Sequence, residues 1–345
     1  MTAVPATMSG VQLVGHGGPE MLVWRDDIPV PRPGSGEVLV KVLAAGVNMT
    51  DLNTRNGWYG GEGRAAGWSG NMAFPRIQGS DLCGRIVALG AGVEGLPLGA
   101  RVICPTNQHE PTDANPIRFV SIGSEFDGAF AQYCVVKARH LHDVSASALT
   151  DVEVGAMPCA HGTAHNLLTR AAVAVGERVL VTGASGGVGL AAVQLAMLRG
   201  AEVTAQCSLS KSAPLRALGA TILPRDATPR SASFDAVIDI VGGDGFQDRL
   251  DALRPGGRYA TSGAVGGPMV KGDLRRIYLN DLTLHGATHQ PREVFAGLVT
   301  IINTARIRPV VSKTYPLRDI ALAQADLAAG RYPGKLVLVP LEPAP

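Results

Sequence analysis

Residues 178–199 (RVLVTGASGGVGLAAVQLAMLR) constrain the fold more than any other part of this chain. The segment opens with the apolar run Val179-Leu180-Val181, which is typical of a buried parallel strand. Four glycines follow, at positions 183, 186, 187 and 189, and strong helix formers occupy most of residues 190–197. The segment therefore predicts a strand, a tight glycine turn and a helix, in that order.

A turn of this kind directs backbone N–H groups and the positive end of a helix at a pyrophosphate. Glycine is needed because a Cβ atom would hold the phosphate away from the main chain. We therefore expect a bound dinucleotide, held by the residues of the turn, which are Gly183, Ala184, Ser185, Gly186, Gly187, Val188 and Gly189.

Three other interpretations of the segment were weighed. Residues 179–198 carry no charge, as in a transmembrane helix, but four glycines in the first half argue against a spanning helix. A glycine-rich turn without a ligand remains an alternative. A mononucleotide phosphate loop is excluded, because no Lys-Ser or Lys-Thr pair follows the glycines.

The tip of the next strand favours NADPH over NADH. In this kind of fold an acidic residue at that tip binds the ribose hydroxyls of NAD, and its absence makes room for a 2′-phosphate. Here the strand covers residues 201–206, and its only acid, Glu202, lies at the opposite end. Ser208, Ser210 and Lys211 are the candidate phosphate ligands. Alternatively, Ser210 and Lys211 only open the helix that ends at residues 218–219.

Composition is typical of a reduced, intracellular enzyme. The 345 residues suffice for two domains, and 31 basic against 29 acidic residues leave no field that would attract nucleic acid or anionic lipid. Five cysteines form no Cys-x-x-Cys pair, which indicates free thiols. The amino terminus shows no basic segment before an apolar core, so we expect a cytoplasmic protein without a secretory signal.

The pattern of strands predicts two domains. Short apolar runs at 36–47, 84–90, 101–103 and 130–136 predict a mostly β, barrel-like domain over residues 1–148. Thr150 and Glu153 have capping-box spacing and should open a helix into the second domain, residues 149–286. There, strands alternate with helices at 188–199 and 209–218, which predicts an α/β, doubly wound parallel sheet. The expected strands are 179–182, 203–206, 221–223, 235–240, 258–262 and 282–285.

Ligands of such sheets lie beyond the carboxyl ends of the strands. We therefore expect the nicotinamide half of the coenzyme beside the residues that follow the fourth and fifth strands, namely Val241, Gly242, Ser262, Gly263 and Ala264. Helices over 291–304 and 318–329 and a strand over 335–339 follow. This third segment, 287–345, should return to complete the first domain, with the coenzyme between the two lobes.

The order of these motifs resembles the medium-chain dehydrogenase/reductase superfamily, and within it the zinc-independent quinone oxidoreductase-like branch. The resemblance spans nearly the whole chain and is carried by VLVTGASGGVG at 179–189, LGA at 218–220, FDAVIDIVGG at 234–243 and GKLVLV at 334–339. It implies a GroES-like catalytic domain and a Rossmann NADPH-binding domain. It also implies that Asn48, as a catalytic residue, and Thr163, as a coenzyme-binding residue, lie near the nicotinamide. It further implies that homodimers or homotetramers join through the sheet edge at 282–286.

The zinc alcohol dehydrogenases of this superfamily bind a catalytic metal through a Cys, the His of a Gly-His-Glu segment, and a later Cys. In this sequence Val47-Asn48-Met49-Thr50-Asp51 stands where the first Cys would be, and Gly79-Ser80-Asp81 replaces Gly-His-Glu. Only Cys159 matches a ligand, so we expect no catalytic zinc. Cys104 stands alone, so a structural zinc is not expected either.

The remaining candidates have simpler interpretations. His161, two residues after Cys159, is expected to cap a helix or to contact the coenzyme amide. Cys83, Cys134 and Cys207 are expected to be buried packing residues.

Without a Lewis acid, alcohol oxidation loses its means of stabilising an alkoxide, whereas reduction of a quinone or an activated double bond needs only a hydrogen-bond donor. Related enoyl reductases carry a Gly-x-Tyr segment after Asn-x-x-Asp, and here Gly57-Trp58-Tyr59 follows Asn48. Tyr59 is therefore the candidate proton donor, with a surface tyrosine as the alternative. Residues 60–74 resemble a lid, with Trp58, Trp68 and Phe74 as walls of an apolar pocket, although a surface excursion fits equally.

These observations predict a zinc-free, NADPH-dependent reductase of quinones or α,β-unsaturated carbonyls. Two alternatives stay open: an NADPH-dependent ketone or aldehyde reductase, and a catalytically silent NADPH-binding protein.

Overall fold

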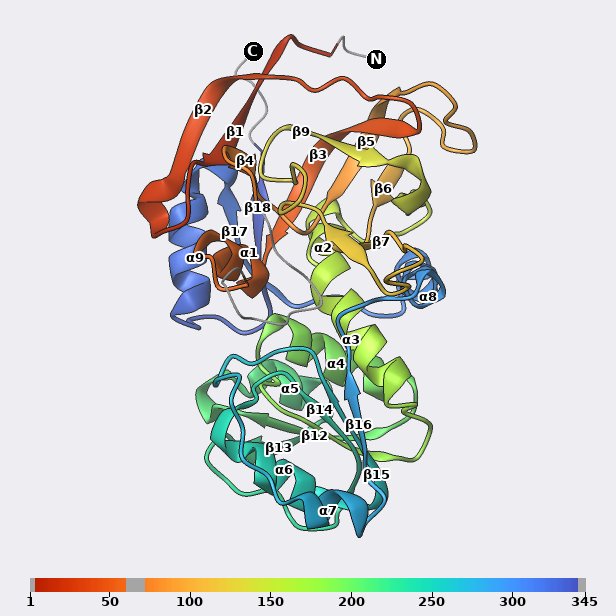
Figure 1. Ribbon diagram of the computed structural model, residues 1–345, viewed down its shortest axis with the longest axis vertical. Helices are drawn as coiled ribbons and strands as arrows, with labels where there is room; N and C mark the ends of the chain where they lie inside the picture. Colours follow the sequence, from red (N-terminus) through yellow and green to blue (C-terminus); the bar gives the residue numbers. More distant parts are fainter. Residues whose placement is uncertain (1–3, 60–71, 341–345) are drawn as a thin grey trace. The chain divides into compact units, whose positions relative to one another are not determined.

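The computed structural model describes residues 4–59 and 72–340 and divides the chain into two compact units (Figure 1). The first unit comprises Met1–Cys159, Pro291–Arg331 and Lys335–Pro345. The second comprises Ala160–Gln290 and Tyr332–Gly334. The first border lies after Cys159 and not after residue 148, because the helix that follows residue 150 packs on the strands of the first unit.

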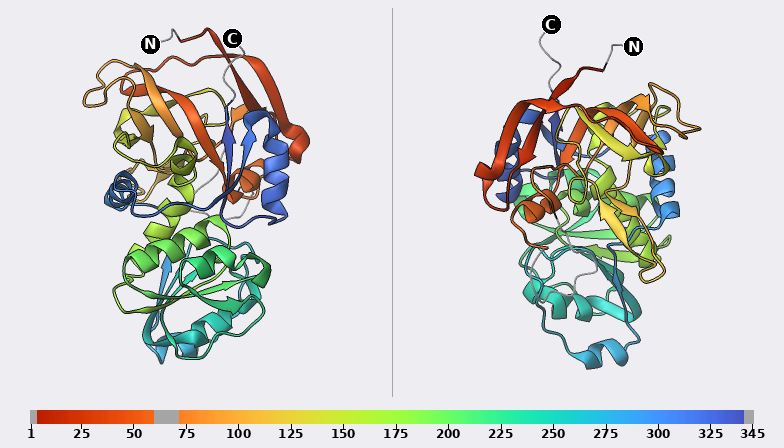
Figure 2. Two further views of the ribbon diagram at one scale, coloured as in Figure 1. Left: turned by 180° about the vertical axis from the view of Figure 1, so that it is seen from behind. Right: turned by 45° about the horizontal axis from the view of Figure 1, so that its top comes forward.

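A seven-stranded sheet dominates the first unit, in the order β10-β6-β5-β3-β18-β17, with β9 also paired to β3. Its longest strand, β3, pairs antiparallel with β5, β9 and β18. The strands are β3 (Glu37–Val47), β5 (Cys83–Leu89), β6 (Arg101–Ile103), β9 (Tyr133–Lys137), β10 (His142–Asp143), β17 (Val311–Pro316) and β18 (Lys335–Val339). The last strand therefore lies against the carboxyl-terminal end of β3, with Leu336 opposite Val47; Figure 2 shows the same sheet from two further sides.

Two smaller sheets and four α-helices complete the described part of this unit. The sheets have the orders β2-β1-β4 and β7-β8. Their strands are β1 (Thr7–Leu13), β2 (Leu22–Pro29), β4 (Arg76–Ile77), β7 (Asn107–His109) and β8 (Phe119–Ser121). The helices are α1 (Met49–Arg55), α2 (Asp151–Gly155), α8 (Arg292–Asn303) and α9 (Ile320–Ala328). Thr150 caps α2 by accepting the Glu153 N–H, at 3.2 Å, which confirms the predicted capping box.

Apolar side chains that alternate along β3, β5 and β18 build the main core of the first unit. Fully buried Leu82, Ile86 and Phe130 lie in this core. Phe130 precedes β9 and bonds through its backbone N–H to Gln78 O, so the strand expected at 130–136 begins at Tyr133 instead.

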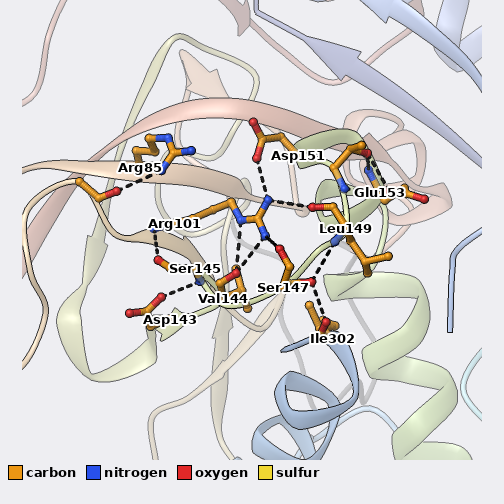
Figure 3. A network of polar contacts seen from close by, with 12 residues as sticks. Arg85, Arg101, Asp143, Val144, Ser145, Ser147, Leu149, Asp151, Glu153 and Ile302 are labelled. Atoms are coloured by element: carbon orange, nitrogen blue, oxygen red, sulfur yellow. Dashed lines mark hydrogen bonds and ion pairs between the residues drawn. The ribbon is translucent and has the colours of Figure 1, made fainter. Parts of the chain in front are cut away.

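Arg101 fixes the segment that leads from the sheet to α2 (Figure 3). Its buried guanidinium donates to the carbonyl oxygens of Val144, Ser147 and Leu149, at 3.0, 2.6 and 2.9 Å respectively. It also pairs with the Asp151 carboxylate at 3.1 Å. One side chain thus satisfies three backbone acceptors of a non-repetitive segment, which would otherwise lose hydrogen bonds on burial.

The second unit contains a six-stranded sheet in the order β13-β12-β11-β14-β15-β16, and every pair in it is parallel. The predicted doubly wound α/β sheet is therefore confirmed. Its strands are β11 (Arg178–Val181), β12 (Glu202–Cys207), β13 (Thr221–Pro224), β14 (Phe234–Asp239), β15 (Leu253–Thr261) and β16 (Thr283–Gly286).

Helices lie on both faces of this sheet, as Figure 1 shows, with α4 and α5 on one side and α6 and α7 on the other. They are α4 (Gly187–Leu198), α5 (Ala213–Ala217), α6 (Phe246–Ala252) and α7 (Leu274–Tyr278); α3 (Pro158–Arg170) precedes the sheet. The helix expected at 209–218 is shorter, because Pro214 has no N–H to donate and is confined to the first turn of α5. None of the helices in the described ranges is long and apolar enough to span a bilayer.

Candidate functional site

The turn between β11 and α4 is closely packed on one side. Gly183 has a φ of +55°, a conformation that favours glycine. A Cβ atom on Gly189 would lie 2.3 Å from Gly183 O and 2.7 Å from Ala184 Cα. The start of α4 can therefore lie this close to the turn only because residue 189 lacks a side chain.

The other side of the same turn is open. A Cβ on Gly186 would meet only Gly183 O, at 3.5 Å, and none of the described side chains caps the N-terminus of α4. The first N–H groups of this helix are therefore without intrahelical acceptors, and they point where an anion would be stabilised by the helix dipole. The turn at residues 183–189 thus fits the pyrophosphate of a dinucleotide.

A buried network beneath the turn holds it against β14. Asp239, at the end of β14, accepts hydrogen bonds from Thr182 Oγ1 and Tyr259 Oη, and its Oδ2 pairs with Arg249 Nη1 at 2.9 Å. Its Oδ1 also accepts the Val241 N–H, at 2.9 Å. One carboxylate therefore connects the residue before the glycine turn to the residues after β14. Sequence reasoning missed this residue, although an acid that ends an apolar strand was a visible signal.

The segments after β14 and β15 lie side by side, as predicted from the strand order. Gly266 N donates to Val241 O at 2.7 Å, and Gly243 N donates to Gly267 O at 3.0 Å. A Cβ on Gly242 would lie 2.9 Å from Gly267 O. Val241, Ser262, Gly263 and Ala264 are half-buried beside this contact, at the carboxyl edge of the sheet.

The tip of β12 carries hydroxyl groups and cations. Ser208 Oγ and Ser210 Oγ are 3.0 Å apart, and Lys211 ends the 3-10 helix η3 (Leu209–Lys211) that follows the strand. No Asp or Glu occurs between Glu202 and Asp226.

Arg225 is a further cation at this tip. The register pairs Cys207 with Pro224, so Arg225 follows β13 beside Ser208. The prediction did not include Arg225; its position directly after a strand was the available signal.

Residues on α3 contact the start of the nucleotide fold. His161 Nε2 lies 3.2 Å from Gln194 Oε1 on α4, so both side chains are part of the packing between these helices. Thr163 is half-buried two positions further along α3. Its expected place near the nicotinamide stays a prediction.

A compact polar cluster lies at the end of β3 in the first unit and is formed by Asn48, Ser80, Asp81 and Lys335, all of which are buried. Asn48 Nδ2 donates to Asp81 Oδ2 at 2.9 Å and to Ser80 Oγ at 3.0 Å. Lys335 Nζ donates to Val47 O at 3.0 Å, to Asp81 Oδ2 at 2.9 Å and to Asn48 Oδ1. The other carboxylate oxygen, Asp81 Oδ1, accepts the Cys159 N–H at 2.6 Å.

This cluster brings together residues from the two segments that lack the expected zinc ligands, Asn48 from the first and Ser80 and Asp81 from the second, and adds Lys335, which the prediction missed. Lys335 was expected only as the first residue of the last strand. A charge at the start of an apolar strand normally indicates an exposed end, so the sequence contained no signal that this side chain points inward.

Two ionisable groups at the cluster, Asp51 and Cys159, have pKa values above the usual ones, so the neutral form of each is favoured. Burial raises the pKa of the Asp51 carboxyl to about 7, against the effect of the Asn48 N–H that it accepts at 2.8 Å. Burial and then the charge of Asp81 raise the pKa of the Cys159 thiol to about 12. Cys159 is therefore a neutral thiol at neutral pH and not a thiolate.

Tyr59 lies four residues after Arg55, the last residue of α1. Its hydroxyl accepts a hydrogen bond from Asn53 Nδ2 at 3.3 Å, and its ring contacts Trp58 edge to face, with 5.0 Å between the centroids. The expected lid at 60–74, including Trp68, lies outside the described residues up to position 71. Phe74 is described, and its ring packs edge to face on His16 with 4.9 Å between the centroids.

Comparison with known proteins agrees with this architecture. The family described as "Alcohol dehydrogenase GroES-like domain" matches residues 34–146, and "Zinc-binding dehydrogenase" matches residues 218–338. An acryloyl-coenzyme A reductase from Metallosphaera sedula is 30% identical over 90% of this chain and 95% of its own length. A quinone oxidoreductase from Rattus norvegicus is 28% identical over 96% of this chain and 98% of its own length.

Among solved structures, a candidate alcohol dehydrogenase from Sinorhizobium meliloti 1021 superposes with a TM-score of 0.90. It is 42% identical, and the match covers 98% of each chain. The GroES-like unit, the parallel nucleotide sheet and these relatives lead to one conclusion: the chain belongs to the medium-chain dehydrogenase/reductase superfamily, in its quinone oxidoreductase-like branch.

Proposed function

We propose that this protein is an NADPH-dependent, zinc-independent reductase of quinones or α,β-unsaturated carbonyls that works in the cytoplasm as a homodimer or homotetramer. The observation that carries the proposal is the charge at the tip of β12. Ser208, Ser210 and Lys211 lie there, Arg225 follows the neighbouring strand, and no Asp or Glu occurs between Glu202, at the start of β12, and Asp226, which follows Arg225. A 2′-phosphate gains charge-assisted hydrogen bonds at such a tip, whereas the ribose hydroxyl of NADH offers the cations no negative charge.

The glycine turn supports the same coenzyme through its main chain. Gly183 to Gly189 would hold the pyrophosphate, while Val241, Gly242, Ser262, Gly263, Ala264 and Thr163 would border the nicotinamide. The free thiols of all five cysteines agree with a reducing compartment such as the cytoplasm.

The zinc that the matching family description names does not fit the residues of this chain. Asn48 and Ser80 offer an amide and a hydroxyl, Cys159 offers a neutral thiol, and the Lys335 ammonium already bonds to the amide oxygen and to Asp81. Zinc in proteins is bound by thiolates, neutral imidazoles and carboxylates. In the described residues, no group of three His, Cys, Asp or Glu side chains could hold a metal ion. No step of the proposed reaction is therefore assigned to a metal.

The substrate class rests on chemistry and on the relatives, which include a quinone oxidoreductase and an acryloyl-coenzyme A reductase. NADPH, when bound, supplies a hydride to the β-carbon of the enone or to the quinone. In our proposal Tyr59 Oη then donates a proton to the resulting enolate or hydroquinone anion and regains one from water. The sum is acceptor, NADPH and one proton converted to reduced acceptor and NADP⁺.

The test compares coenzymes and acceptors on the purified protein. Calorimetry should give a Kd for NADPH at least tenfold below that for NADH. Lys211→Gln should raise the NADPH Kd about tenfold, as expected for one lost charge-assisted hydrogen bond, and leave the NADH Kd unchanged. Arg178→Gln, which removes a half-exposed charge at the opposite end of the sheet, is the matched control and should change neither value.

Turnover is measured next with separate panels of quinones, enones and simple ketones or aldehydes. NADPH oxidation by a quinone or an enone, unaffected by a chelator, is the expected result. Equal affinity for both coenzymes would contradict the NADPH assignment. Turnover restricted to ketones or aldehydes would favour the carbonyl reductase, and tight NADPH binding without any turnover would favour a silent binding protein.

A further inference from the structure

Lys335 is a lysine inside the protein, and every donor of its side chain is used. Only 4% of its surface is exposed. An ammonium has three N–H donors, and three oxygens accept from this one: Val47 O, Asn48 Oδ1 and Asp81 Oδ2. Lysine is almost never fully buried unless it is paired, so this arrangement requires an explanation.

The oxygens around the ammonium come from segments that are far apart in the sequence. Val47 and Asn48 end β3, Asp81 precedes β5, and Lys335 begins β18. Asp81 also accepts the Cys159 N–H at the start of α3. The cluster therefore connects four segments of the first unit through one cation and one carboxylate.

Two of these segments continue directly into the second unit. The residue after Cys159 is Ala160, and the residue before Lys335 is Gly334, and both belong to the second unit. Within that unit Gly334 N donates to Ser185 O of the glycine turn at 2.8 Å. Asp81 thus bonds to Cys159 and Lys335, which lie at two of the places where the chain passes from one unit to the other.

Charge explains why a cation is needed at this position. Asp81 is completely buried and Asp51 nearly so. Lys335 is the partner of Asp81 among the described ion pairs, at 2.9 Å. A buried carboxylate without a counter-charge is strongly unfavourable, so these oxygens need a cation whether it is part of the chain or bound from solution.

We propose that the Lys335 ammonium is an internal cation that takes the place of a metal ion in this cluster and positions Asn48 and Asp81. The proposal rests on the zinc-independent part of the proposed function and is independent of the coenzyme and the acceptor. Removing Lys335 would leave the oxygens of Val47, Asn48 and Asp81 without a cation. Carboxylate, carbonyl and amide oxygens together are acceptable ligands of a divalent cation such as cobalt.

The experiment titrates the purified, metal-free protein with Co²⁺ and follows its visible absorption. The wild type and Lys335→Arg, which keeps the charge, should show no protein-bound cobalt bands. Lys335→Ala should bind one equivalent and develop bands that disappear in Lys335→Ala/Asp81→Ala. Cobalt bands of equal intensity in the wild type, or none in a folded Lys335→Ala protein, would overturn the proposal.

If Lys335→Ala does not fold, a double-mutant cycle measured by thermal unfolding tests the proposal instead. Lys335→Met should lower the midpoint of thermal unfolding by roughly 10 °C, because it leaves the Asp81 carboxylate unpaired. Lys335→Met/Asp81→Asn should recover at least half of that loss, since both charges are then removed. An unchanged midpoint in the single variant, or no recovery in the double variant, would contradict an internal cation. Neither readout requires turnover, so a failure here is distinguishable from a failure of the proposed reductase activity.

Discussion

The Asn48 side chain uses both its amide nitrogen and its amide oxygen in hydrogen bonds within the protein, and this bears on its role as a candidate catalytic residue. Its nitrogen donates to Ser80 and Asp81, and its oxygen accepts from Lys335. The motif containing Asn48 and the loss of zinc ligands at 48 and 80 were readable from the sequence. The partner that holds Asn48 was not, because the direction of the Lys335 side chain depends on tertiary pairing of β18 with β3. We propose that Asn48 is a positioning residue, which acts on the reaction by orienting the side chains that it contacts.

Tyr59 remains the proposed proton donor, and its replacement tests this at the level of a single oxygen. Tyr59→Phe should lower kcat for enone reduction roughly ten- to a thousandfold, which overlaps the usual contribution of a general acid. The NADPH Kd should not change, because the ring stays in place. Steady-state kinetics checks both values.

The control is Tyr278→Phe, which removes the same hydroxyl from an exposed position on α7 of the second unit. It should leave kcat unchanged. Unaltered enone turnover by Tyr59→Phe would exclude Tyr59 as the proton donor.

Elements with strong local signals were predicted well, and elements defined by tertiary contacts were not. The β11 strand, the glycine turn and α4 follow from a run of apolar residues, glycines and helix formers in succession. In contrast, β7 and β8 pair through only three residues each and lack an apolar run, and β2 exposes most of its residues. Such strands exist because a partner supplies their hydrogen bonds, which a single sequence does not show.

The irregular segment 143–151 depends on one arginine, which makes a prediction about stability possible (Figure 3). Arg101→Met should lower the free energy of unfolding of the first unit by about 3 kcal/mol, because three carbonyl groups and Asp151 lose their donor. Two of the three tryptophans, at positions 24 and 58, lie in the described part of that unit. Urea unfolding followed by tryptophan fluorescence therefore reports on it directly.

Arg85→Met provides a matched control from a neighbouring strand. Arg85 is exposed, and its guanidinium donates to Gly99 O at 3.2 Å, so its removal should cost less than about 0.5 kcal/mol. If Arg101→Met and Arg85→Met shift the urea midpoint equally, the guanidinium does not organise the 143–151 segment.

At the scale of the whole chain, the change from a β-rich half to an alternating α/β half was readable from the sequence. The position of the border was not. Residues 150–159 carry helical signals like those of the second unit, yet α2 packs on β3 and Cys159 bonds to Asp81. Likewise, Tyr332–Gly334 belong to the second unit although the residues on both sides belong to the first. Only contacts between distant residues determine such assignments.

The edge of the nucleotide sheet leads to a prediction about assembly. In the described structure β16 pairs on one side only, with β15, and several exposed apolar residues precede it in the sequence or lie on it. These are Val265, Met269, Leu274, Tyr278, Leu279 and Leu284, with Leu274 72% and Met269 84% exposed. An open edge with an apolar border is a surface that proteins normally cover, and a second copy of the same chain can do so by a two-fold contact.

We therefore expect a dimer, or a tetramer built from such dimers, joined through β16. Light scattering after size exclusion should give at least twice the chain mass for the wild type at micromolar concentration. Leu279→Lys/Leu284→Lys should give the monomer, because two charges would be buried in the contact without partners. Val175→Lys, at a 79% exposed position elsewhere on the second unit, should keep the wild-type mass. A monomeric wild type would show that this edge stays open in solution, and the exposed apolar residues would then need another partner.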